Sequence, residues 1–311
     1  MCYKIFCGQL KKVGIYFCFM DYALKNRNRY CVITLLLTGM LLLFCTDKVP
    51  GPFKKIRKLL PPTVLKKPPQ KDGINILFLH HSTGRHIWEG GVAPWFDKYN
   101  NEHNTAYHIT GQEFPKEKPY GWNNYPYDYW NIWVKNAGNK PYKKEPTLEM
   151  ITSFYNVVIF KHCYPVSRIA SDQGSASVAS MEKRVENYKE QYRALKIKMK
   201  EFPEAKFILW TGAALVKGAV KEAEAKRAHQ FFTWVREEWD EAGDNIFLWD
   251  FYTLETEGGL YLLDSNASGP DDSHPNEQFS KKAAPLFCQR IIDVINGHGD
   301  TEPVADQSQL Q

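Results

Sequence analysis

The chain has 311 residues, of which 43% are hydrophobic, and its 18 Phe, 17 Tyr and 9 Trp are enough for a sizeable core in one large or two small domains. The net charge of +5 is uneven, because residues 1–72 carry 14 Lys and Arg against 3 Asp and Glu, which leaves 26 against 32 in the rest. The part that we expect to fold is therefore mildly acidic, which argues against nucleic acid as a partner.

Residues 1–45 carry the pattern of an export signal. A basic stretch, Lys25–Tyr30, precedes an apolar run, Val32–Phe44, which is too short to span a bilayer comfortably and suits the core of a signal peptide. The run leads into Cys45, and Leu42-Leu43-Phe44-Cys45 is similar to a bacterial lipoprotein cleavage box in which Cys45 is lipidated. We expect an exported protein, periplasmic or at the cell surface, that associates with the membrane through this segment. An ordinary secretory signal and an uncleaved anchor are the alternatives.

Three further regions follow this segment. Residues 46–72 are rich in Pro and Lys, which predicts an extended, solvated linker. Residues 73–298 contain periodic elements typical of one domain, and residues 299–311 are polar, which predicts a disordered tail. Five of the seven cysteines lie in the first 45 residues, and the remaining Cys163 and Cys288 are interpreted as free thiols rather than as metal ligands.

The stretch Ile74–Arg85 changes abruptly from apolar to polar. Its apolar first part predicts a strand buried on both faces of a parallel sheet, and the spacing of apolar residues after it predicts a helix. Ser82 would then lie at the carboxyl edge of the sheet and at the amino end of a helix, where free backbone N–H groups favour developing negative charge. Ser82 is therefore a candidate nucleophile, although serines at such positions often only cap a helix.

Further strands and helices alternate along the chain. The predicted strands are 106–110, 157–160, 206–210 and 246–249, and the predicted longer helices are 178–200, 221–241 and 277–295. This order predicts an α/β fold with a doubly wound, mostly parallel five-stranded sheet and helices on both faces. Binding and catalytic residues of such sheets collect at the carboxyl ends of the strands.

A second polar motif lies before the last helix, in the stretch Gly269–Asn276. Here Asp271 precedes His274 by three residues, a spacing at which a carboxylate can orient a histidine that acts as general base for a serine. Asp272 is a competing carboxylate, but its adjacency to Ser273 and His274 favours a solvated loop. The sequence therefore predicts a triad of Ser82, His274 and Asp271.

An opening strand that ends in serine and a terminal Asp-x-x-His before the last helix resemble the SGNH (GDSL-type) hydrolase family. The resemblance covers Gly73 to His298, and His80-His81-Ser82 stands where the family has Gly-Asp-Ser. It implies a flavodoxin-like architecture and an oxyanion hole made by the Ser82 N–H, a glycine N–H and an asparagine side chain.

The two further oxyanion donors have to be sought in this sequence. Gly138 is a plausible glycine, with Gly121 as the alternative. The family's Gly-x-Asn-Asp block should fall near Lys161–Tyr164, but no asparagine occurs there. Lys161 and His162 are therefore the candidates for the side-chain donor.

The segment 111–147 is irregular and rich in aromatic residues. Its rings either pack the segment onto the sheet or line a sugar-binding face, for which Trp122 and Trp130 are the candidates. We also expect a short helix over 128–134.

Together these features predict an exported serine ester hydrolase that removes acyl groups such as acetate from a carbohydrate or another small molecule. We expect it to act as a monomer without a metal or another cofactor. The main alternative is a catalytically weak, surface-anchored glycan-binding module that uses the aromatic segment. A metal site from His80, His81, His86 and His162, or phosphate binding at 81–85, is weaker because neither pattern is complete.

Overall fold

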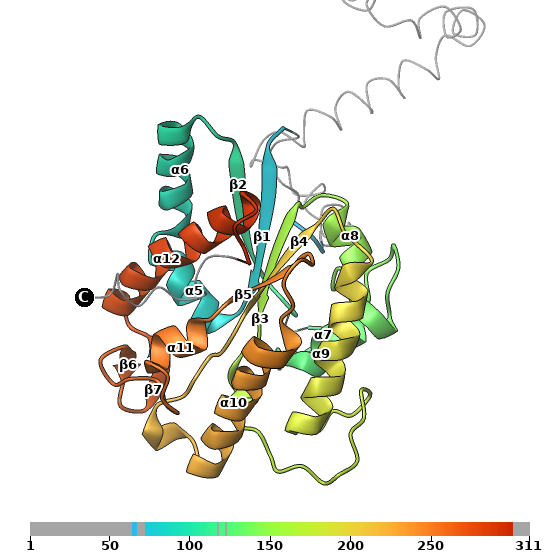
Figure 1. The fold of residues 1–311 in the computed structure, drawn as a ribbon, viewed down its shortest axis with the longest axis vertical. Coiled ribbons are helices and arrows are strands. Elements are labelled where there is room, and N and C mark those ends of the chain that lie inside the picture. Colours follow the sequence, from blue (N-terminus) through green and yellow to red (C-terminus); the bar gives the residue numbers. More distant parts are fainter. Residues whose placement is uncertain (1–63, 67–71, 117, 122, 301–311) are drawn as a thin grey trace, which may run out of the picture. The chain divides into compact units, whose positions relative to one another are not determined.

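The computed structural model describes residues 64–66, 72–116, 118–121 and 123–300 (Figure 1). The expected export segment with Cys45, the candidate Trp122, most of the linker and residues 301–311 lie outside the described residues. Among the helices that are described, none is long and apolar enough to cross a membrane.

The centre of the fold is a parallel sheet in the order β2-β1-β3-β4-β5, which confirms the predicted α/β class. Its strands are β1 Ile74–His80, β2 Tyr107–Glu113, β3 Val157–Lys161, β4 Lys206–Trp210 and β5 Ile246–Trp249. Alternate side chains of the strands enter two hydrophobic clusters. In β1, Phe78 faces one cluster and Leu77 the other. The sheet is therefore buried on both faces, as its near-continuous apolar strands predict.

Helices cover each face of the sheet (Figure 1). One cluster lies under α5 Ser82–Glu89, α6 Val92–His103, α11 Phe251–Thr256 and α12 Glu277–Ile295. The other lies under α7 Pro126–Tyr129, α8 Leu148–Thr152, α9 Val185–Lys200 and α10 Glu222–Trp234. A small antiparallel hairpin of β6 Ala267–Gly269 and β7 Asp272–Pro275 precedes α12 and was not predicted.

The aromatic segment packs onto the sheet. After α7 the chain continues as a π-helix, η2 Trp130–Lys135, so the expected short helix exists in a mixed form. Trp133 lies edge-on to Phe160 of β3, with ring centroids 5.3 Å apart, and is fully buried. Trp130 is buried, its ring packs against that of Tyr127 with centroids 5.6 Å apart, and the Lys135 ammonium lies over it at 5.7 Å, so the ring does not present the sugar-binding face that we expected. The packing interpretation holds for the described rings, and the glycan-binding alternative loses this part of its proposed surface.

Three boundaries differ from the prediction. β2 continues to Glu113 because its polar end still pairs with His80 of β1. α9 begins only at Val185, because the residues just before it are not helical. There the backbone carbonyl of Lys183 accepts a hydrogen bond from the Ala170 amide. The predicted helix 221–241 ends as an α-helix at Trp234 and continues as a π-helix, η5 Val235–Trp239.

The expected linker is not solvated throughout. Leu65 is buried, and the Gln112 side chain of β2 brackets it by accepting from the Lys66 amide at 2.9 Å and donating to the Val64 carbonyl at 3.0 Å. The folded unit therefore includes Val64–Lys66. At the other end Gly299 is also buried, and its carbonyl accepts from Arg290 at 2.7 Å.

Candidate active site

Ser82 is the first residue of α5 and is half-buried, directly after the end of β1. The first hydrogen bond of the helix joins the Arg85 amide to the His81 carbonyl at 2.9 Å, so the amides of Ser82, Thr83 and Gly84 have no partner within the helix. His81 occupies the N-cap position but does not cap the helix with its side chain. The amino end of α5 therefore offers free N–H donors beside the Ser82 hydroxyl.

Gly84 allows α5 to lie close to the sheet. A Cβ at this position would come within 2.5 Å of the His80 Cβ and 3.0 Å of the Lys161 Cδ. Any larger residue would push the helix away from the ends of β1 and β3. The glycine of the Ser-Thr-Gly stretch thus fixes the position of Ser82, the candidate nucleophile, and it brings the Lys161 stem beneath the helix.

His274 lies on β7 and is held by a carboxylate. Its Nδ1 is 2.6 Å from Oδ1 of Asp272, and the same oxygen accepts the His274 amide at 3.0 Å. The carboxylate that holds the His274 ring is therefore Asp272, and the contact that we expected from Asp271 is not formed. The Asp271 carboxylate instead faces Gly218. The side chain of Ser273 fixes β7 by accepting the Val216 amide at 3.1 Å.

Two hydrogen bonds set the ionisation of Asp272. The His274 amide and then the His274 ring stabilise the carboxylate and hold its pKa below the ordinary value of 3.8. The acid is therefore ionised at neutral pH and fixes the Nδ1–H tautomer of His274. This leaves Nε2 of His274, which makes no hydrogen bond among the described residues, as the atom that can accept a proton.

The two halves of the candidate triad meet along α5. His86 lies one helical turn after Ser82, and its ring stacks on that of His274 with centroids 5.1 Å apart. Tyr164 approaches His274 edge-on from the end of β3, at 5.6 Å. The Ser82 hydroxyl makes no hydrogen bond among the described residues, so the direct Ser82–His274 contact is not formed in this structure. The contacts between α5 and β7 place both residues on neighbouring elements of the same face.

Gly138 lies at the opposite edge of the sheet and is not an oxyanion donor. Its carbonyl accepts from Thr147 at 2.5 Å, and its amide binds the Glu149 carboxylate on α8. Glu149 in turn binds Lys198 at the end of α9, at 2.8 Å. Both contacts belong to the segments that lead into strands, at the amino edge of the sheet.

The two candidates for the side-chain donor also fail, for different reasons. His162 is fully buried on the far face of the sheet, between the rings of Tyr129 at 4.7 Å and Tyr192 at 5.5 Å. Lys161 is on the α5 face, but it is also fully buried, and its Nζ donates to the His162 carbonyl at 2.7 Å. The Lys161 ammonium group therefore lies close to the start of α5 but is too deeply buried to contact a substrate.

Two other buried groups at this edge were not assigned from the sequence. The Tyr164 hydroxyl approaches that of Thr83, and burial raises its pKa, so it remains a neutral phenol. Glu255 on α11 accepts the Ala214 amide at 2.5 Å, and complete burial raises its pKa as well. Tyr164 belongs to the polar block that follows a predicted strand, which is a usable signal. The position of Glu255 within a helix gives no sequence signal that it belongs to this edge.

Metal binding finds no support in this arrangement. Within the described part of the chain, no three His, Cys, Asp or Glu side chains come together in a way that could hold a metal ion. The histidines of the alternative metal site have different surroundings: His81 Nε2 donates to the Pro115 carbonyl at 2.6 Å, whereas His162 lies in the aromatic cluster.

Comparisons with known proteins add the following findings. No protein-family model matches the chain, and no curated protein is significantly similar to it. Among solved structures, an acetyl xylan esterase is similar at 14% identity with a TM-score of 0.46, over 70% of this chain and 100% of that one. A psychrotrophic esterase, EstA from Pseudoalteromonas sp., is similar at 14% identity and 0.38, over 72% and 97%. A carbohydrate esterase is similar at 11% identity and 0.37, over 72% and 70%.

Proposed function

We propose that this chain is a serine ester hydrolase in which Ser82 is the nucleophile, His274 the general base and Asp272 the residue that orients His274. The observation that carries the proposal is the 2.6 Å contact between Asp272 and Nδ1 of His274, on a hairpin that contacts the helix beginning at Ser82. A carboxylate, an imidazole with an open Nε2 and a hydroxyl at a helix amino end are the parts that acyl transfer requires.

The reaction would proceed in two halves. His274 Nε2 takes the proton of Ser82 as Oγ attacks the ester carbonyl, and the oxyanion is stabilised by the free amides of the first turn of α5. His274 then gives the proton to the leaving alcohol, which departs and leaves an acyl group on Ser82. A water molecule, deprotonated by His274, attacks this acyl group and restores the serine. Asp272 stabilises the imidazolium in both halves.

The substrate that we propose is a carbohydrate carrying small acyl groups such as acetate. His274 and Ser82 are both half-buried rather than enclosed, so an acyl ester on a large sugar chain could reach them. We propose no cofactor, and we propose that the protein is a monomer exported to the periplasm or cell surface. The basic and apolar pattern before Cys45 supports the location.

The test uses the purified chain, a small aryl acetate and a fluorophosphonate that labels activated serines. Wild type should hydrolyse the ester and carry the label on Ser82, and Ser82→Ala should lose roughly 10³-fold or more in kcat/KM. Ser153→Ala is the matched control, because Ser153 is exposed at the end of α8 and binds only the Glu149 carbonyl, at 2.6 Å. Unchanged turnover in Ser82→Ala would remove Ser82 from the mechanism.

The proposed location has a separate test. Fractionation of cells that produce wild type or Cys45→Ser should find the wild type with the membrane and the variant released from it. Retention of both in the membrane would indicate an uncleaved anchor.

A further inference from the structure

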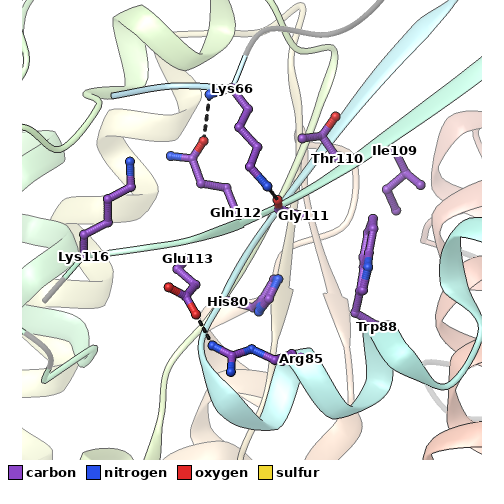
Figure 2. Close-up of a pocket in the computed structure, with 10 residues that line it drawn as sticks. All are labelled: Lys66, His80, Arg85, Trp88, Ile109, Thr110, Gly111, Gln112, Glu113 and Lys116. Carbon is purple, nitrogen blue, oxygen red and sulfur yellow. Dashed lines mark hydrogen bonds and ion pairs between the residues drawn. The ribbon is translucent and has the colours of Figure 1, made fainter. Parts of the chain in front are cut away.

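A cavity of about 620 Å³ lies beside the candidate active site, between α5, the edge strand β2 and the Val64–Lys66 segment (Figure 2). This volume is in the range of small-molecule sites. Six of the lining side chains carry the argument: Lys66, His80, Arg85, Trp88, Glu113 and Lys116. None of them belongs to the triad.

The cavity adjoins the nucleophile through α5. Arg85 follows Ser82 by three residues and Trp88 follows Arg85 by three, so each occupies the neighbouring position around the helix surface. Figure 2 shows both side chains on the cavity side of this helix. His80, at the end of β1, lies two residues before Ser82. A ligand whose ester group reached Ser82 would therefore extend past Arg85 into the cavity.

The charge of the cavity is positive, although the chain beyond residue 72 is acidic. Arg85 is paired with the Glu113 carboxylate. Within the part of the chain that the structure describes, the ammonium groups of Lys66 and Lys116 have only carbonyl partners, Gly111 at 2.7 Å and Val64 at 3.3 Å.

Among the described residues, one further carboxylate lies behind the wall. Buried Glu145 accepts the Lys116 amide at 2.6 Å, and burial raises its pKa to about 7, so it carries only part of a charge at neutral pH. The described part of the cavity therefore leaves two lysine charges for a ligand that is itself negative.

The inner wall adds a hydrogen-bond acceptor and an aromatic ring. Nδ1 of His80 is 3.1 Å from the His81 carbonyl, which can only accept, so Nδ1 carries the proton and Nε2 is an acceptor. Nε2 lies above Gly111, 3.1 Å from where a Cβ would be. The Trp88 ring stacks beside His80, with centroids 6.5 Å apart. An acceptor for a hydroxyl group next to an aromatic face is the chemistry that binds a sugar ring.

We propose that this cavity binds a carboxylate-bearing sugar unit of the acylated carbohydrate, with Lys66 and Lys116 facing the carboxylate and with His80 and Trp88 contacting the sugar ring. The proposal rests on the ester hydrolase function above and adds the charge of the substrate. It makes Lys66 and Lys116 specificity residues and assigns them no part in bond breaking.

The experiment compares two forms of one substrate: an acetylated oligosaccharide of uronic acid and the same oligosaccharide with its carboxyl groups reduced to alcohols. Wild type should have a kcat/KM roughly tenfold higher on the acidic form, and added salt should reduce this preference. Lys66→Gln/Lys116→Gln should abolish the preference and keep the rate on a small aryl acetate. Lys98→Gln/Lys140→Gln is the control, because these exposed lysines lie on α6 and in the segment before α8.

A second variant tests the wall without changing charge. Gly111→Ala would place a methyl group against His80 Nε2 and 3.3 Å from the Trp88 ring. It should weaken binding of the acidic and the reduced form alike. A cooperative thermal unfolding transition, measured for each variant, establishes that the variant is folded.

Failure of this inference and failure of the proposed function are distinguishable. Equal kcat/KM of wild type on the acidic and reduced substrates, with normal hydrolysis of the aryl acetate, would overturn the cavity assignment alone. If no ester is cleaved, calorimetry with the unacetylated uronic acid oligosaccharide and its reduced form still decides. Tighter binding of the acidic form, lost in the double lysine variant, supports the cavity assignment, and equal or absent binding of the two forms overturns it.

Discussion

Two neighbouring carboxylates, Asp271 just before β7 and Asp272 at its start, allow a direct test of the candidate triad. Asp272→Asn keeps an oxygen for the His274 amide, so the turn should be preserved, but it removes the charge that faces Nδ1 at 2.6 Å. The amide can also present its NH₂ group to the ring and thereby favour the wrong tautomer. Asp271→Asn changes a carboxylate of the same size one residue away that does not contact the ring.

The size of the effect follows from the exposure of the pair. Replacing the triad carboxylate by its amide lowers kcat by about 10⁴ where that carboxylate is buried. The Asp272 side chain is 55% exposed, so water stabilises part of the imidazolium charge when the carboxylate is lost. We therefore expect a loss of about 10²–10³ in kcat, or about 2.7–4 kcal/mol, for Asp272→Asn and less than about twofold for Asp271→Asn.

The assay is hydrolysis of an aryl acetate by the two variants between pH 5 and 9. Because the pKa of Asp272 is lowered, its protonation and the loss of the stability that it contributes fall below this range. The loss of rate in Asp272→Asn should therefore persist across the whole range. An equal or larger loss in Asp271→Asn would refute the assignment and restore Asp271 as the partner of His274.

Four further measurements test the surroundings of the site. Burial lowers the pKa of His80 and of His81 to about 4, while unfolded histidine titrates near 6.5, so stability should fall as pH drops from about 6.5 to 4, by roughly 3 kcal/mol per histidine in urea titrations. Lys161→Met removes a nearby positive charge that lowers both values, so NMR titration should show both pKa values rise. His162→Ala should cost about 2–3 kcal/mol of stability and leave kcat unchanged, because the ring packs on the far face of the sheet. Tyr164→Phe should change the unfolding midpoint little, since its hydroxyl only approaches Thr83, and a rate loss above tenfold would give it a catalytic role.

The strands were predictable because their signal is local. Runs such as Val157–Phe160 are apolar without interruption, which only a strand or helix buried on both sides tolerates, and their short length favours a strand. The end of β2 was missed because Gln112 and Glu113 are polar. Gln112 is buried for a non-local reason, since its amide group binds Val64 and Lys66 more than 40 residues earlier. No window of the sequence contains that contact.

The choice between Asp271 and Asp272 needed the β6–β7 hairpin. Spacing alone favours a carboxylate three residues before the histidine, as on a loop or helix. In the hairpin, Asp272 instead turns its oxygen back onto the amide and the ring of His274 two residues later. Short side-chain-to-backbone bonds of this kind are available to any Asp, so the sequence does not rank the two.

The alternation of side chains along β3 decides which candidate oxyanion donors can face α5. Neighbouring residues of a strand point to opposite faces, and Ile159 of β3 belongs to the cluster under α5 while Phe160 belongs to the other. By the same alternation Lys161 lies on the α5 face and His162 on the far face, so His162 could have been excluded before the structure was known. The next backbone donor of this block, the Cys163 amide, is occupied by the Asn124 carbonyl at 2.9 Å. Since Lys161 is fully buried, neither Lys161 nor the Cys163 amide faces a substrate, which is why the proposed mechanism places the oxyanion at the free amides at the start of α5.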